Sequence, residues 1–85
     1  MKLTLAQLFY SFSAMCHRLD PALPPLKAEE EIWLGDEGLY HKMNILALHE
    51  LPRYRQLIHS TGSRRQALQI EMLNLLWREC RQWLE

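Results

Sequence analysis

The residues that could do chemistry in this chain are few, and their spacing matches no familiar site. The candidate metal ligands near neutral pH are His17, His41, His49, His59, Cys16 and Cys80. No two histidines stand four residues apart as in a helical zinc site, and no Cys-x-x-Cys pair occurs. Cys16 and His17 are adjacent, so on a helix their side chains diverge by about 100°. We therefore expect no metal, no cofactor, and histidines on polar helix surfaces.

Motifs for nucleophilic or nucleotide chemistry are also missing. The three glycines form no phosphate-cradling loop and no dinucleotide fingerprint, and no serine sits in a nucleophile elbow. Glu29, Glu30 and Glu31 are consecutive, so on a helix they point in three directions and suit a solvated face better than a shared cation. The chain is therefore predicted not to be an enzyme.

The arginines of the second half give the best case for nucleic-acid binding. The best segment is Arg53 to Arg65, where a helix, a tight turn and the start of a longer helix resemble the order that helix-turn-helix proteins use. Arg53, Arg55, Arg64 and Arg65 could there contact phosphates or base edges. Against this, ten basic residues are balanced by ten acidic ones, whereas proteins that bind the phosphate backbone usually have a basic surplus. A small dimeric DNA-binding regulator is the alternative function.

The stretch around which we expect the chain to be organised is its last, Ser63 to Glu85, which contains no glycine and no proline. Ser63 and Gln66 fit a capping box, and most of the following residues are good helix formers. We expect a helix over about residues 63–84, the longest of the fold.

This helix is more apolar than one packing contact requires. One set of apolar residues repeats at intervals of three and four: Ile70, Leu73, Trp77, Cys80 and Leu84. A second set lies beside it: Leu68, Met72, Leu75, Leu76 and Trp83. Together they cover roughly 220° of the circumference, whereas a surface helix needs little more than about 100°. Either the other helices wrap it completely, or a second chain covers part of it.

Glu79 indicates which set faces outward. It projects into the second set, and a lone carboxylate is almost never fully buried. The first set is therefore predicted to be the core. The predicted protein interface is Leu68, Met72, Leu75, Leu76, Glu79 and Trp83. In the alternative, Arg53 or Arg55 pairs with Glu79 inside one monomer and the helix is the centre of a wrapped bundle.

Residues 1–19 predict an amphipathic helix in preference to a signal peptide, because polar residues interrupt the apolar run and no good cleavage site follows. Thr4 and Gln7 form a capping box. The apolar stripe of this helix is Leu5, Leu8, Phe9, Phe12, Cys16 and Leu19. The Asp20–Pro25 segment then ends the helix as an extended connector, from which Leu23 and Leu26 enter the core.

Three shorter elements are expected between this connector and the last helix. Residues 27–34 predict a helical turn or two, ended by Gly35, with Asp36 as the next N-cap. Residues 37–50 predict a helix that Pro52 kinks or ends, and residues 53–60 a further short helix. Gly62 closes the turn into the last helix.

The whole chain, residues 1–85, is thus expected to be one all-α domain, a small bundle of three to four helices. Two cysteines are too few for a disulfide scaffold, so we expect reduced core thiols in a cytoplasmic protein, with a Cys16–Cys80 bridge as the alternative. The predicted function is a non-enzymatic protein-interaction module. It would be a homodimer, or an adaptor, chaperone or inhibitor that binds another protein through an apolar face of the last helix.

Overall fold

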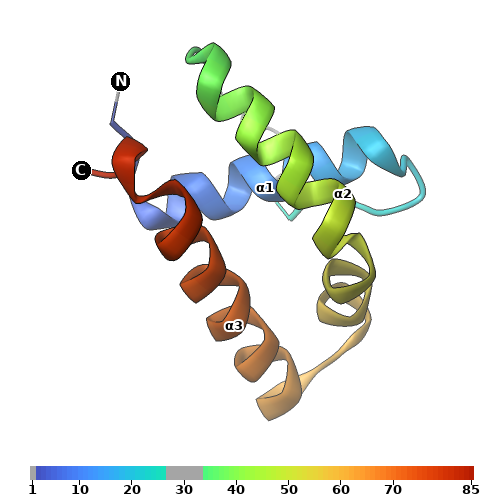
Figure 1. The fold of residues 1–85 in the computed structure, drawn as a ribbon. Helices are drawn as coiled ribbons and strands as arrows, with labels where there is room; N and C mark the ends of the chain where they lie inside the picture. Colours follow the sequence, from blue (N-terminus) through green and yellow to red (C-terminus); the bar gives the residue numbers. More distant parts are fainter. Residues whose placement is uncertain (1, 27–33) are drawn as a thin grey trace.

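The protein is a small bundle of α-helices. Our computed structural model describes residues 2–26 and 34–85. Within them it contains α1 (Leu5–Leu19), α2 (Glu37–His59), α3 (Gly62–Cys80) and a final 3-10 turn, η1 (Arg81–Trp83) (Figure 1). The all-α prediction is confirmed for this part of the chain. The short helix predicted for residues 27–34 falls, except for Leu34, outside the described residues.

The beginnings of α1 and α2 follow the sequence signals. The Gln7 N–H donates to Thr4 Oγ1 (3.1 Å), and the Thr4 N–H donates to Gln7 Oε1 (2.9 Å), so the capping box is confirmed. Asp36 caps α2 by accepting a hydrogen bond from the Leu39 N–H (3.1 Å). These bonds satisfy backbone donors that the first turn of a helix leaves unpaired.

α2 continues through Pro52 as one helix of 23 residues, so the predicted break into two helices is wrong. An internal proline removes a backbone hydrogen bond and costs about 3 kcal/mol. Tyr54 and Leu57, which follow it, are fully buried on the same side of α2 as Met43 and Ala47. A break at Pro52 would turn these two large side chains away from the core. Their burial therefore offsets the cost of the proline.

α3 begins one residue earlier than expected and without the predicted cap. Its N-cap is Thr61, whose side chain makes no capping bond, so the Ser63–Gln66 capping box is wrong. Only Ser60 and Thr61 separate α2 from α3, and Gly62 (φ +63°) adopts the left-handed conformation that this tight reversal needs. With 19 residues, α3 is shorter than α2 and is not the longest helix.

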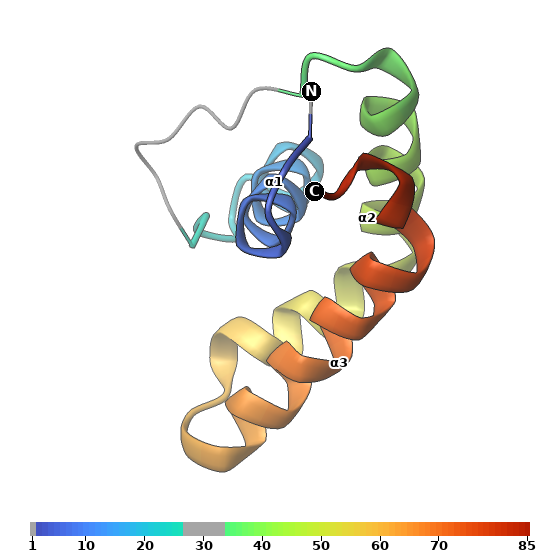
Figure 2. The ribbon, with the colours of Figure 1, turned by 90° about the vertical axis from the view of Figure 1, so that its left-hand side faces the viewer.

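The three helices pack around one core, with α1 lying across the pair formed by α2 and α3 (Figures 1 and 2). The start of α3 extends beyond α1 in Figure 2, and residues 62–67 are all exposed. Near the other end of α3 the two chain termini lie side by side (Figure 2). There Leu3 forms a parallel β-bridge with Leu84. The Leu3 N–H donates to the Trp83 carbonyl (2.9 Å), and the Glu85 N–H donates to the Leu3 carbonyl (3.1 Å).

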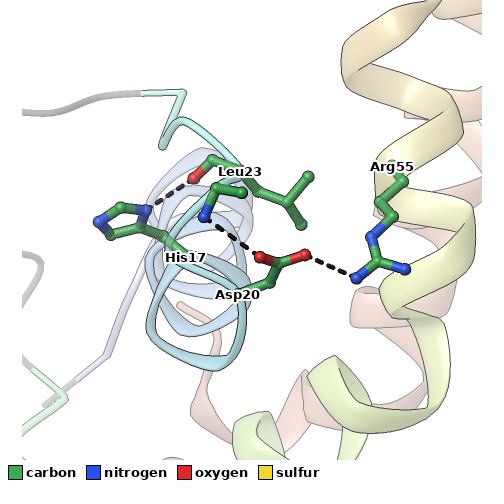
Figure 3. Close-up of polar contacts among 5 residues, drawn as sticks. His17, Asp20, Leu23 and Arg55 are labelled. Atoms are coloured by element: carbon green, nitrogen blue, oxygen red, sulfur yellow. Dashed lines mark hydrogen bonds and ion pairs between the residues drawn. The ribbon is translucent and has the colours of Figure 1, made fainter.

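The far end of α1 is tied down by the connector that follows it (Figure 3). His17 Nδ1 donates to the Leu23 carbonyl (2.6 Å), since a carbonyl oxygen can only accept. Asp20 accepts from the Ala22 N–H (3.1 Å) and pairs with Arg55 of α2 (2.6 Å). These bonds, led by that from Arg55, hold the pKa of the Asp20 carboxyl below its usual value. His17 is thus a half-buried anchor and not the surface histidine we expected, whereas the other three histidines are exposed.

A buried hydrogen-bonded pair completes the attachment of the connector. The Leu26 N–H donates to Ser13 Oγ (2.8 Å), which is in turn hydrogen-bonded to Tyr54 Oη (2.5 Å). Leu23 is buried and Leu26 packs against the core, as predicted. The connector therefore links α1 to α2 through its side chains as well as through the chain itself.

Candidate protein-binding surface

The most unusual surface feature is a line of large apolar side chains along α3. Ile70 and Trp77 are 58% and 53% exposed, and Leu73 between them is half-buried. Their spacing of three and four residues places them on one side of the helix. We call these three residues the outer stripe.

Three other residues of α3 have side chains that solvent cannot reach: Met72, Leu76 and Cys80. We call these three residues the buried stripe. Met72 and Leu76 belong to the predicted interface, and their assignment to an outward face is wrong. The remaining members of that predicted interface are half-buried: Leu68, Leu75, Glu79 and Trp83.

Of the residues predicted to form the core side of the last helix, only those near its C-terminal end are buried. Cys80 and Leu84 are buried, as predicted, but Ile70 and Trp77 lie on the surface and their assignment to the core is wrong. The helix is therefore rotated from the predicted orientation, so that the side expected to face inward carries the exposed apolar residues.

Glu79 explains why the orientation was predicted incorrectly. Its carboxylate pairs with Lys42 of α2 (3.2 Å) and lies near Arg78 (3.5 Å), at the edge of the core. Lys42 above all holds the pKa of Glu79 below its usual value. Pairing within the monomer was the alternative in the sequence analysis, but the partner is a lysine that it did not name. A paired carboxylate can border a core, so Glu79 does not mark an outward face.

Beside the outer stripe, a groove opens between α1 and α3. Its volume is about 280 Å³, and its lining residues are Leu5, Ala6, Phe9, Tyr10, Gln69 and Leu73. Leu73 belongs to both the groove and the outer stripe, so the two form one continuous, mainly apolar surface. Leu5 and Phe9 belong to the predicted apolar stripe of α1, but the sequence does not reveal the groove, because no pattern within α1 shows that α3 borders it.

The four arginines singled out for nucleic-acid contact are divided between two environments. Arg53 pairs with Glu50 within α2 (3.4 Å), and Arg55 pairs with Asp20. Arg64 and Arg65 are exposed in the first turn of α3. The structure therefore leaves only the last two without a carboxylate partner among the described residues.

The thiols are not placed for chemistry. Cys16 and Cys80 are free and fully buried, as expected for core thiols. Burial raises the pKa of Cys16 to about 12 and that of Cys80 to about 11, which disfavours the nucleophilic thiolate. The Cys80 thiol lies 3.9 Å from the sulfur of Met43. Within residues 2–26 and 34–85, no group of three or more His, Cys, Asp or Glu residues is placed to hold a metal ion.

No protein-family model, no curated protein and no solved structure gives a significant match to the chain. None of the helices in the described part has the length and apolar character that a bilayer-crossing segment needs.

Proposed function

We propose that this chain is a non-enzymatic protein-interaction module that binds its partner through the outer stripe of α3 and the adjacent groove. The observation that carries the proposal is the exposure of Ile70 and Trp77 beside an apolar groove. Contiguous apolar surface of this kind typically marks a binding site, and tryptophan is enriched among residues that dominate binding energy. The partner is a second copy of the chain, or another protein that the chain serves as adaptor, chaperone or inhibitor.

The chemistry of the other side chains supports a binding role over catalysis. The two thiols are buried, and burial raises their pKa to about 12 and about 11, which disfavours the reactive thiolate. Free buried thiols also suit a reducing compartment, so we propose a cytoplasmic location. DNA binding is the weaker candidate, because ion pairs already engage Arg53 and Arg55.

The test uses two variants on the outer stripe and one matched control. Ile70→Ser and Trp77→Ser remove apolar surface from the proposed site. Leu48→Ser removes it from the outside of α2, where Leu48 is 56% exposed. Light scattering on a sizing column over a range of concentrations measures self-association. Selection from a displayed library of helical peptides, with the full chain as bait, measures binding to another polypeptide.

We expect Ile70→Ser and Trp77→Ser to weaken self-association or binding of the selected peptides at least about tenfold, with Leu48→Ser close to the unchanged chain. Association that is insensitive to both stripe variants would contradict the proposed site. Salt-dependent binding to duplex DNA that Arg64→Glu and Arg65→Glu abolish would favour the regulator instead.

A further inference from the structure

Charge is divided unevenly between the two halves of the fold, although the chain as a whole is neutral. Residues 1–19 and 61–85, which supply α1, α3 and η1, contain six basic and three acidic residues. The described residues 20–26 and 34–60 contain three basic and four acidic residues. Both walls of the groove come from the basic half, because they are formed by α1 and α3.

Basic side chains lie at both ends of this surface. Arg81 is exposed and begins η1, the turn that follows α3 and leads to the paired termini. Lys2 lies at the same end, where its Nζ donates to the Gln82 carbonyl (2.7 Å). Arg65 is exposed at the other end of α3, about 40° around the helix from Gln69, whereas the equally exposed Arg64 lies about 140° from Gln69. Among the described residues, neither these two arginines nor Arg81 has a carboxylate within ion-pair distance.

The carboxylates of this half lie mostly away from the groove. Glu79 is paired with Lys42 on the side of α3 that faces α2. Glu71 lies about 160° around the helix from Gln69 and Leu73, at 100° per residue. Glu85 is the exception. Its N–H donates to the Leu3 carbonyl, so it lies near the end that carries Lys2 and Arg81. The residues that line the groove carry no charge, and Gln69 contributes a side-chain amide to the lining.

We infer that the occupant of this surface is an amphipathic helix of another protein with an acidic border. Apolar side chains at positions i, i+3 or i+4, and i+7 enter the groove, and carboxylates beside them meet Arg81 and Lys2 at one end and Arg65 at the other. An apolar cavity of about 150 Å³ accommodates benzene, so about 280 Å³ has room for more than one apolar side chain. This inference rests on the proposed function and specifies its partner.

Charge also disfavours the other occupants. A second copy docking through the same surface would bring its own Arg65 and Arg81 to the contact, and like charges in an interface are costly. Nucleic acid binds mainly through its phosphates, which need basic groups along the contact, whereas the lining between the two basic ends is apolar. An acidic apolar helix complements both the lining and the ends.

The test compares two synthetic peptides of about 15 residues, a length at which designed sequences begin to be helical. Both have leucines at i, i+3, i+4 and i+7. One has glutamates at the flanking positions and the other has lysines at the same positions. Fluorescence anisotropy measures their binding to the full chain. We expect the glutamate peptide to bind at least about tenfold more tightly, with a preference that decreases as salt is added.

Charge reversal on the protein provides the matched pair of variants. Arg81→Glu should remove the preference for the glutamate peptide, while Arg53→Glu on α2 should leave it unchanged. Equal binding of the two peptides, or a preference for the lysine peptide, would overturn the inference. So would tighter binding of duplex DNA, or of vesicles of phosphatidylglycerol and phosphatidylcholine, if Arg81→Glu abolishes it.

The failure of this inference and the failure of the proposed function give different results. If the chain forms a dimer that Trp77→Ser disrupts, or binds peptides at the groove without regard to charge, only the inference fails. If neither peptide binds and the stripe variants alter no association, the proposed function fails as well.

Discussion

The two sides of α3 have similar residues at similar spacing, yet one is fully buried and the other is exposed. Met72, Leu76 and Cys80 form the buried stripe, and Ile70, Leu73 and Trp77 form the outer stripe. Both satisfy the helical repeat that predicts a packed face. The difference shows that periodicity identifies residues that share a side of a helix, but does not say which side the rest of the chain covers.

The position of α1 decides between the two sides. At one end Leu3 is bonded to the backbone around Leu84, and at the other Asp20 is paired with Arg55. These attachments hold α1 across one side of the α2–α3 pair. A single helix of 15 residues cannot also cover the remaining part of an arc of roughly 220°. The outer stripe is the part that is left uncovered.

The largest expected effect is a difference in unfolding free energy between substitutions in the buried stripe and substitutions in the outer stripe. Leu76→Ala empties space in a fully buried position and should lower the free energy of unfolding by about 2–5 kcal/mol. Leu48→Ala and Trp77→Ala should each cost clearly less than Leu76→Ala, because about half of each of these side chains is already exposed in the folded chain. Urea denaturation measures all three. A loss with Trp77→Ala as large as that with Leu76→Ala would mean that the outer stripe is covered in the isolated chain.

A smaller effect should test the attachment that keeps α1 over the buried stripe. Tyr54→Phe removes the hydrogen bond to Ser13 and should cost about 0.5–1.5 kcal/mol in urea denaturation. Tyr40→Phe is the control, because Tyr40 is 42% exposed on the same helix. Equal effects of the two substitutions would show that the buried hydroxyl pair does not stabilise the crossing of α1.

Alkaline pH should lower the stability of the fold through its buried ionisable groups and not through the outer stripe. The pKa of Cys80 is about 11 and that of Cys16 about 12, and burial also raises the pKa of Tyr54. Between pH 9 and 11 the unfolded chain ionises its thiols while the folded chain keeps them protonated, so the unfolded state binds fewer protons and stability falls. The stabilising contribution is complete below pH 9 and is lost as the pH rises.

Urea denaturation at several pH values measures this decline. Cys80→Ala should make the decline shallower, whereas Trp77→Ala should leave its slope unchanged. A steeper decline with Cys80→Ala, or rapid alkylation of Cys80 in the folded chain at neutral pH, would contradict a fully buried thiol.

The smallest effect should come from the ion pair at the border between α2 and α3. Lys42 and then Arg78 lower the pKa of Glu79, so the contribution of the pair is present above pH 4.5 and is lost as the pH falls. Because the pair is partly exposed to water, which screens it, Glu79→Gln should shift the denaturation midpoint only slightly at pH 7. The variant should also lose less stability than the unchanged chain between pH 7 and pH 3. A large loss at pH 7 would mean that Glu79 holds α3 in place.

Much of the fold follows from local patterns in the sequence. The Thr4–Gln7 capping box, the Asp36 cap and the apolar stripe of α1 each depend on residues within a few positions of one another, and the structure confirms them. The excess of apolar residues on α3 was also apparent, and it predicted correctly that one contact would not cover them all.

Other features depend on contacts between distant residues. α2 passes through Pro52 because Tyr54 and Leu57 are buried against other parts of the chain. Glu79 borders the core because Lys42, on another helix, neutralises it.

The sequence by itself determined that this protein is helical, where α1 and α2 begin, and that α3 has two apolar sides. Only the tertiary structure decided which side is covered, and therefore where the candidate binding surface lies. The helical repeat is a local property, whereas α1 is positioned by the β-bridge between Leu3 and Leu84 and by the pair of Asp20 and Arg55. Those contacts join residues far apart in the chain, so no pattern within α3 contains them.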